Sequence, residues 1–342
     1  FQYNGIKLFG PDGYKIPDSM EDEITRLIQN GEVEDIRPTA ERIGTARRID
    51  DAVGRYIEYA KASFPKGMRL DGLKIVCDCA HGAAYKVGPS TFSELGAEVI
   101  AIGERPNGTN INDGCGSTRP EDMRATVIRE RADVGIAFDG DADRIVMADE
   151  EGRLIDGNGL LAILACDMLK SGRLPQNCLA TTIMANGGLL KAIEPLGGKI
   201  IWTKVGDRYV VEAMREHDLA LGGEASGHMV LLEYNTTGDA LIAALQVLAT
   251  MVRHDTPLSV LASVYHHMPE AHANVPHDDG AVPSEEELAG LVREAEAGLK
   301  GRGRVVIRPS GTEPIIRVMV QHEVRREAEA LVEALAKRVA AL

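Results

Sequence analysis

Three aspartates follow an apolar run at alternate positions, and they are the residues of this chain best suited to bind a metal. The run from Val134 to Phe138 predicts a buried strand, and Asp139, Asp141 and Asp143 follow it with only glycine and alanine between them. Three carboxylates in one tight loop repel one another unless a cation lies between them, and hard divalent ions prefer oxygen ligands. The spacing therefore predicts a Mg2+ site. The alternative is a solvated acidic turn, because aspartate is common in loops.

A second candidate is the segment Arg308-Pro309-Ser310-Gly311-Thr312-Glu313-Pro314, with Arg317 just beyond it. Successive backbone N–H groups in a turn form an anion-binding nest, and arginine adds a bidentate donor that suits phosphate. The length of the turn and its two flanking arginines favour a phosphate site. A hairpin turn with small polar residues is the alternative.

A glycine-rich loop at 222–228 carries groups that could bind a sugar. Glu224 and Ser226 can hydrogen-bond to sugar hydroxyls, and His228 could move a proton near neutral pH. A single glycine-rich motif is weak evidence, so a turn with a surface histidine is the alternative.

The segment Val205-Gly206-Asp207-Arg208 leads into a predicted helix. Its backbone amides and Arg208 could hold an anion at the N-terminus of that helix. Alternatively, Asp207 is an ordinary N-cap residue.

The elements that must position these loops alternate between strand and helix in two stretches. The first has predicted strands at 73–80, 97–103 and 134–139 and predicted helices at 86–95 and 121–131. The second has predicted strands at 179–184, 199–205 and 219–222 and predicted helices ending at 169 and spanning 189–196 and 209–217. This alternation predicts parallel sheets covered by helices, with ligands at the carboxyl ends of the strands. The acidic loop and the loop at 206–208 both follow such ends.

A polar connection is predicted at 273–287, because the segment has two prolines, three successive acidic residues and few large apolar residues. Beyond it, helices at 288–299 and 325–342 and strands at 304–307 and 315–320 predict a small α+β domain with an antiparallel sheet. At the front, 5–14 and a helix-like segment at 22–30 resemble the end of another α/β unit. We therefore expect an α/β protein of four parts, at 1–50, 51–152, 153–256 and 257–342.

Composition narrows the class of protein. The formal net charge of -14 argues against a nucleic acid or an anionic membrane as the main partner. The five cysteines have no zinc-ribbon spacing, so we expect reduced thiols, a cytoplasmic location, and packing of Cys77 and Cys79 as small apolar residues. The apolar segments are too short to span a membrane, and the chain does not open with a signal peptide.

Five loops, in order along the whole chain, resemble the phosphohexomutase superfamily; they lie at 4–13, 107–118, 139–144, 223–228 and 308–314. The resemblance implies four domains around one cleft and a phosphoserine that donates its phosphoryl group to a hexose phosphate. Within the superfamily the chain most resembles the bacterial enzymes that interconvert glucosamine 6-phosphate and glucosamine 1-phosphate on the route to UDP-N-acetylglucosamine and cell wall. The implied intermediate is glucosamine 1,6-bisphosphate, and the family suggests a homodimer.

The resemblance also implies roles for individual residues. Asp139, Asp141 and Asp143 would hold Mg2+ beside the phosphoserine, with Arg144 and Lys7 against its phosphate. Glu224 and Ser226 would bind sugar hydroxyls, and His228 would be a candidate for proton transfer. The sugar-phosphate side would be lined by Gly206, Asp207 and Arg208, and the distal phosphate would be bound by Arg308, Ser310, Gly311, Thr312 and Arg317.

Several features depart from the family pattern. The Ser-His-Asn-Pro loop that carries the family's serine does not occur in the sequence, so we expect most of the first domain to be missing and these 342 residues alone to be inactive. Ala142 stands where the metal loop usually has glycine, which tolerates a positive φ better than alanine. Arg119 stands where a histidine is frequent, and Asn186-Gly187-Gly188 replaces part of a Ser-Asn-Leu-Gly segment.

Three other functions remain open from the sequence. A haloacid-dehalogenase-like phosphatase would use Asp139 as its nucleophile, although Asp143-Arg144 replaces the small residue and threonine expected there. The absent serine loop leaves room for a non-catalytic sugar-phosphate binder. A phosphoglucomutase or phosphomannomutase would differ only in its sugar, a difference worth a few kcal/mol of discrimination at best.

Overall fold

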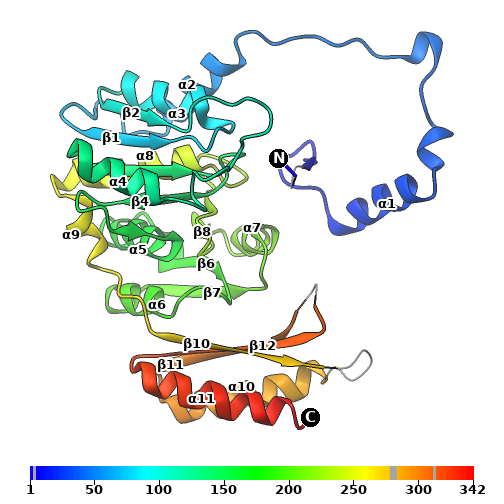
Figure 1. Ribbon diagram of the computed structural model, residues 1–342, viewed down its shortest axis with the longest axis vertical. Helices are drawn as coiled ribbons and strands as arrows, with labels where there is room; N and C mark the ends of the chain where they lie inside the picture. The colour runs from blue at the N-terminus through cyan, green and yellow to red at the C-terminus, as the bar shows by residue number, and fades with distance from the viewer. Residues whose placement is uncertain (3–4, 278–282, 311–312) are drawn as a thin grey trace. The chain divides into compact units, whose positions relative to one another are not determined.

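The computed structural model describes residues 1–2, 5–277, 283–310 and 313–342 (Figure 1). The chain divides into two compact units. Unit 1 comprises 1–154 and 228–259, and unit 2 comprises 155–227 and 260–342. Each unit is therefore assembled from two separate stretches of the chain.

Unit 1 contains β2, β1, β3 and β4 of a five-stranded sheet with the order β2-β1-β3-β4-β5. β1 pairs in parallel with both β2 and β3, and β4 is antiparallel to β3. The predicted βαβαβ order is thus confirmed, and β4 follows β3 as an antiparallel strand. The bounds are β1 (Lys74–Asp78), α3 (Ala84–Glu94), β2 (Glu98–Ile102), α4 (Glu121–Glu130), β3 (Val134–Phe138) and β4 (Ile145–Ala148).

The strand β3, which leads into the acidic loop, is buried along its whole length. Burial on both faces explains why its sequence is continuously apolar rather than alternating. A Cβ at Gly135 would lie 2.1 Å from Sδ of Met123, so α4 packs closely over this strand. The rigid strand fixes the position at which the loop begins.

The helix α8 (Ala240–His254) completes the core of unit 1. All its residues from Ala240 to Met251 are buried, as expected for a helix that is apolar on every side. It contacts β3, β4 and α2 (Ala52–Ala62). In the sequence this segment is an apolar run too short to span a membrane, and its packing against β3 and β4 is visible only in the structure.

Unit 2 contains two sheets. In the first, β6 pairs in parallel with both β7 and β8. In the second, the order is β10-β12-β11 and both pairings are antiparallel, with α10 and α11 on one face (Figure 1). The α/β class and the small C-terminal α+β domain are confirmed. The bounds are α5 (Gly157–Lys170), β6 (Cys178–Thr182), α6 (Gly188–Ile193), β7 (Lys199–Thr203), α7 (Asp207–Glu216), β8 (Leu221–Gly223), β10 (Glu270–Pro276), α10 (Glu285–Leu299), β11 (Gly303–Pro309), β12 (Ile315–His322) and α11 (Arg325–Val339).

One predicted connection is partly wrong. The segment predicted as an exposed connection at 273–287 begins inside β10, which pairs with β12 as far as Pro276. Residues 278–282 of this connection lie outside the described residues. The remaining short elements are α1 (Asp18–Gln29), η1 (Glu32–Glu34), η2 (Ala40–Arg42), β5 (Leu154–Ile155), η3 (Pro175–Asn177), η4 (Glu194–Leu196), β9 (Met229–Leu231) and α9 (Leu258–Ala262).

The five cysteines are all buried. The Sγ atoms of Cys77 and Cys79 lie 3.7 Å apart, and this contact together with burial raises the pKa of the Cys77 thiol above its ordinary value. The pair therefore packs in the core as small side chains, as predicted. Among the described residues, no helix combines the length and apolar character needed to cross a membrane.

Candidate active site

The three aspartates of the acidic loop converge in the structure. One carboxylate oxygen from each of Asp139, Asp141 and Asp143 lies within 4.8 Å of the others. Asp139 is fully buried, whereas the side chain of Asp143 is 20% exposed and that of Asp141 is 55% exposed. The set thus opens from a buried base toward solvent, and oxygen donors at this spacing fit a hard divalent cation.

Backbone hydrogen bonds hold the buried end of the loop. Oδ1 of Asp139 accepts from the backbone N–H groups of Asp143 and Arg144 at 3.1 and 3.0 Å. Ala142 has φ of 59°, so the residue between two of the aspartates is left-handed although it is not glycine. This conformation turns the chain sharply enough to bring the alternate carboxylates together.

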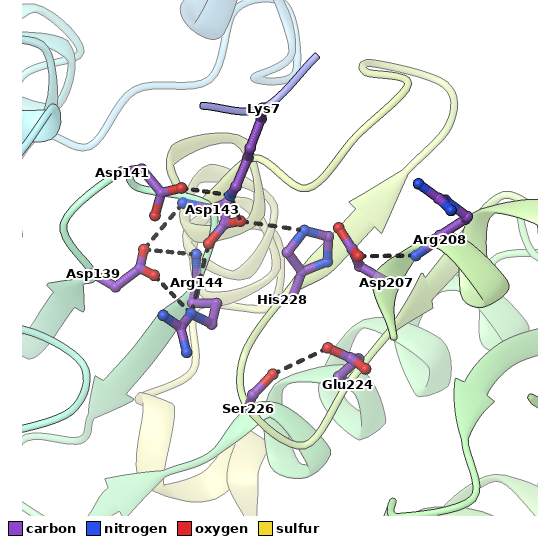
Figure 2. Close-up of polar contacts among 10 residues, drawn as sticks. All are labelled: Lys7, Asp139, Asp141, Asp143, Arg144, Asp207, Arg208, Glu224, Ser226 and His228. Carbon is purple, nitrogen blue, oxygen red and sulfur yellow. Dashed lines mark hydrogen bonds and ion pairs between the residues drawn. The ribbon is translucent and has the colours of Figure 1, made fainter. Parts of the chain in front are cut away.

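Two cationic side chains face the aspartates (Figure 2). Nζ of Lys7 lies 2.5 Å from Oδ2 of Asp141 and 2.7 Å from Oδ2 of Asp143. Nε of Arg144 lies 2.7 Å from Oδ2 of Asp139. The structure therefore brings together in unit 1 the predicted metal ligands and both predicted phosphate contacts.

The electrostatics of the loop follow from burial. Burial, followed by repulsion from Asp143, raises the pKa of Asp139 to about 6, although Arg144 opposes the shift. Burial also acts to raise the pKa of Asp143, but hydrogen bonding to Lys7 and the charge of His228 outweigh it and lower the pKa. Burial lowers the pKa of Lys7, but its two aspartate partners more than offset this, so the net shift is upward.

His228 belongs to this cluster rather than to the protein surface. Its side chain is only 5% exposed, and its Nε2 lies 3.7 Å from Oδ2 of Asp143. The backbone of His228 forms an isolated antiparallel bridge with Arg144. A Cβ at Gly238 would lie 2.3 Å from Nε2, so that glycine packs directly against the ring. The alternative of a surface histidine in a glycine-rich turn is therefore wrong.

The sugar-binding candidates meet within unit 2. Oε1 of Glu224 accepts from the backbone N–H of Gly206 at 3.2 Å, and Oγ of Ser226 lies 3.4 Å from Oε2 of Glu224 (Figure 2). The N-cap of α7 is Gly206, at φ of 132°, and the helix starts at Asp207. Asp207 is thus not the N-cap, and its Oδ1 instead accepts from the backbone N–H of Arg208 at 2.9 Å.

The arginine turn joins β11 to β12. Arg308 and Arg317 are direct cross-strand partners in the register of these strands. Like charges directly opposite each other destabilise a sheet unless an anion lies between them. Arg317 forms an ion pair with Glu313 at 2.8 Å, and the backbone N–H of Ser310 donates to the carbonyl of Ile315. The predicted ligands Gly311 and Thr312 lie outside the described residues.

The acidic loop packs closely against a second backbone segment, at Gly82 and Ala83. A Cβ at Gly82 would lie 2.1 Å from the carbonyl oxygen of Gly140, which also accepts a hydrogen bond from the N–H of Ala83 at 2.8 Å. Because the clash involves backbone atoms, no change of rotamer can relieve it. Gly82→Ala is expected to lower the free energy of unfolding by about 1–3 kcal/mol, measured by urea denaturation, and to weaken Mg2+ binding.

The matched control is Gly54→Ala in α2, where a Cβ meets nothing within 4 Å. That change is expected to stabilise the protein by about 0.5–1 kcal/mol, because alanine is the better helix former. Equal unfolding midpoints for Gly82→Ala and the wild type would contradict the close packing.

Three models of known protein domains together match most of the chain. The model of phosphoglucomutase/phosphomannomutase α/β/α domain II matches residues 54–152, that of α/β/α domain III matches 156–268, and that of the C-terminal domain matches 270–338. The chain belongs to the phosphoglucomutase/phosphomannomutase family. Membership of this family excludes the haloacid-dehalogenase alternative.

Relatives of known name lie in the same family. The chain is 53% identical over 325 residues to phosphoglucosamine mutase of Geotalea uraniireducens, an alignment that covers 94% of this chain and 71% of the relative. It is 53% identical over 323 residues to phosphoglucosamine mutase of Magnetococcus marinus, with 94% and 66% covered. The predicted resemblance to the phosphohexomutases is confirmed.

Solved structures share the fold. A phosphoglucomutase/phosphomannomutase family protein from Burkholderia thailandensis superimposes with a TM-score of 0.73 at 19% identity, covering 93% of this chain and 69% of the other. N-acetylphosphoglucosamine mutase of Aspergillus fumigatus, solved in complex with GlcNAc-6P and magnesium, gives a TM-score of 0.62 at 22% identity, with 84% and 69% covered.

Proposed function

We propose that this chain carries the metal, sugar and phosphate sites of a phosphoglucosamine mutase, which interconverts glucosamine 6-phosphate and glucosamine 1-phosphate. The observation that carries the proposal is the 53% identity, over 94% of the chain, to a protein of that name. The converged aspartates with Lys7 and Arg144, and the paired arginines of β11 and β12, supply the groups that such chemistry needs.

The residues of unit 1 are proposed to act on the phosphoryl group being transferred. Bound Mg2+ at the three aspartates would neutralise negative charge on that group as it develops. Lys7 and Arg144 would donate charged hydrogen bonds to its oxygens, which requires them to exchange aspartate partners for phosphate. His228, whose Nε2 lies 3.7 Å from Oδ2 of Asp143, is proposed to move a proton.

The residues of unit 2 are proposed to bind the rest of the substrate. Glu224 and Ser226 would hydrogen-bond to sugar hydroxyls, and Gly206 with Arg208 would line the sugar-phosphate side. Arg308 and Arg317 would bind the distal phosphate, which lets either end of glucosamine 1,6-bisphosphate occupy that site while the other end reacts. Ala225, between Glu224 and Ser226, is proposed to influence the choice of sugar.

Kinetics on three sugar phosphates test this assignment. The polypeptide made from the whole reading frame that includes this chain is assayed with the 1-phosphates of glucosamine, glucose and mannose, with and without Mg2+ and a bisphosphate primer. We expect glucosamine 1-phosphate to give the highest kcat/KM and both additions to be required. Faster turnover of glucose 1-phosphate would favour a phosphoglucomutase, and binding without turnover would favour a non-catalytic binder.

Acid is expected to weaken Mg2+ binding, because the metal needs the deprotonated carboxylate of Asp139. The pKa of this group is raised to about 6, so protons compete increasingly with Mg2+ as the pH falls through that value. The expected loss of affinity is about tenfold between pH 7 and pH 5, measured by isothermal titration calorimetry. Titration in buffers of different ionisation enthalpy gives the number of protons released on Mg2+ binding. An affinity for Mg2+ that does not change with pH would refute the expectation.

The homodimer and the cytoplasmic location remain predictions from the resemblance and from the cysteines. The division at 1–50, 51–152, 153–256 and 257–342 is likewise proposed, and it differs from the two compact units of the fold. Limited proteolysis followed by mass spectrometry of the fragments would test the proposed division.

A further inference from the structure

The metal loop contains a residue in an unfavourable backbone conformation. Ala142, between Asp141 and Asp143, has φ of 59°. Left-handed backbone is unfavourable for an L-residue with a Cβ, so such a conformation persists only when its surroundings enforce it. Relaxation of Ala142 would change the direction of the chain between two proposed metal ligands.

The first turn of α8 holds this residue in place. The backbone N–H of Ala240 donates to the carbonyl oxygen of Ala142 at 3.1 Å. As the first residue of α8, Ala240 has no acceptor for its N–H within the helix, so this group is available to a partner outside it. The carbonyl of Ala142 is therefore fixed by the position of the start of the helix.

Asp239 determines where that helix starts. It is the N-cap of α8, and its Oδ1 accepts from the backbone N–H of Ile242 at 3.0 Å. The hydroxyl of Tyr56 donates to the same carboxylate at 2.9 Å, and Nδ2 of Asn235 donates to Oδ2 at 3.2 Å. Asp239 is only 7% exposed, and its burial raises the pKa of the carboxyl, a shift that these three donors oppose.

The turn before α8 also touches the other side of the cluster. Gly238 precedes Asp239 and packs against the ring of His228, which itself lies 3.7 Å from Asp143. One short segment of the chain thus contacts both the strained residue of the metal loop and the histidine beside its last ligand.

We propose that Asp239 is a positioning residue for the metal site: by capping α8 it places Ala240, which holds Ala142 in the left-handed conformation that the aspartates require. The proposal rests on the proposed metal-binding function of the loop. Asp239 is not one of the proposed metal ligands, and its proposed effect passes through the hydrogen bond of Ala240 to the backbone of Ala142.

The first test measures Mg2+ affinity of the 342-residue chain by isothermal titration calorimetry. Asp239→Ala is expected to weaken binding about five- to tenfold, because the cap is lost and Ala142 can relax. Asp239→Asn retains an acceptor for the cap and is expected to recover most of the affinity. Ala142→Gly in the Asp239→Ala background is also expected to restore binding, since glycine adopts the positive φ without enforcement.

The matched control is Tyr59→Phe. Tyr59 lies one turn beyond Tyr56 on α2, and its hydroxyl bonds to the carbonyl of Tyr234 instead of to Asp239. Tyr59→Phe is expected to leave Mg2+ affinity unchanged. Unchanged affinity in Asp239→Ala, or failure of Ala142→Gly to restore it, would overturn the proposal.

A second measurement does not depend on the metal. The midpoint of urea unfolding is measured without Mg2+. Asp239→Ala is expected to shift this midpoint less when residue 142 is glycine than when it is alanine, because glycine adopts the left-handed conformation without strain. Strictly additive midpoint shifts would overturn the proposal even if the wild type failed to bind Mg2+. Failure of the wild type to bind Mg2+, together with coupled midpoints, would refute only the metal assignment.

Discussion

Replacing Asp141 with asparagine is expected to weaken Mg2+ binding about 10- to 100-fold while leaving the fold intact, because the change removes one of three negative charges from the ligand set. The side chain of Asp141 is 55% exposed and forms an ion pair with Lys7. An exposed ion pair contributes little to stability, so the unfolding midpoint should stay near that of the wild type. Calorimetric titration with Mg2+ and urea denaturation measure the two quantities.

The matched control is Asp113→Asn. Asp113 is also exposed and lies in the loop of unit 1 where Asn112 donates from its backbone to the carbonyl of Ala80. Asp113→Asn removes one negative charge from unit 1, as Asp141→Asn does, but outside the acidic loop. The affinity for Mg2+ should therefore change less than twofold. Equal losses in both variants would mean that general electrostatic attraction, and not coordination by Asp141, accounts for binding.

The metal ligands could be predicted from the sequence because their spacing alone carries the argument. An apolar strand followed by Asp139, Asp141 and Asp143 limits the geometry to a short loop at a strand end. What holds that loop could not be predicted, because it comes from distant segments. The contacts of Gly82 with Gly140 and of Ala240 with Ala142 depend on how the chain packs, and no local pattern encodes them.

The cap at Asp239 did leave a local signal. Gly238-Asp239 directly before a long apolar run is the pattern of a helix N-terminus. This pattern is enough to predict the start of α8, although not the hydrogen bond of that helix to the metal loop. The proposed role of Asp239 can be recognised only in the three-dimensional structure, where the N–H of Ala240 donates to the carbonyl of Ala142.

The strand β10 was not predicted from the sequence, and its composition explains why. β10 is an edge strand of its sheet, and its burial is irregular along the strand. Its polar residues and its terminal Pro276 are typical of a loop in sequence, yet an edge strand tolerates both because one side of its backbone faces no partner strand. Pairing with β12 therefore overrides the local preference.

Arg317→Gln is expected to weaken binding of glucosamine 6-phosphate about 10- to 100-fold without lowering stability. A hydrogen bond to a charged group contributes roughly 1.5–3 kcal/mol, and the substitution removes such a donor from the phosphate site. The stability of the ligand-free protein should not fall, because Arg317 lies directly opposite Arg308 and its ion pair with Glu313 is exposed. Binding is measured by calorimetry and stability by urea denaturation.

Loss of affinity without loss of stability distinguishes a binding arginine from a structural one. Arg302→Gln is the matched control, because Arg302 is exposed and immediately precedes β11, at the opposite end of that strand from the turn. It should leave both quantities near their wild-type values at physiological ionic strength, where surface charges are screened. If Arg317→Gln instead destabilised the protein and bound the ligand normally, the paired arginines would belong to the sheet, and the distal phosphate would have to be bound elsewhere.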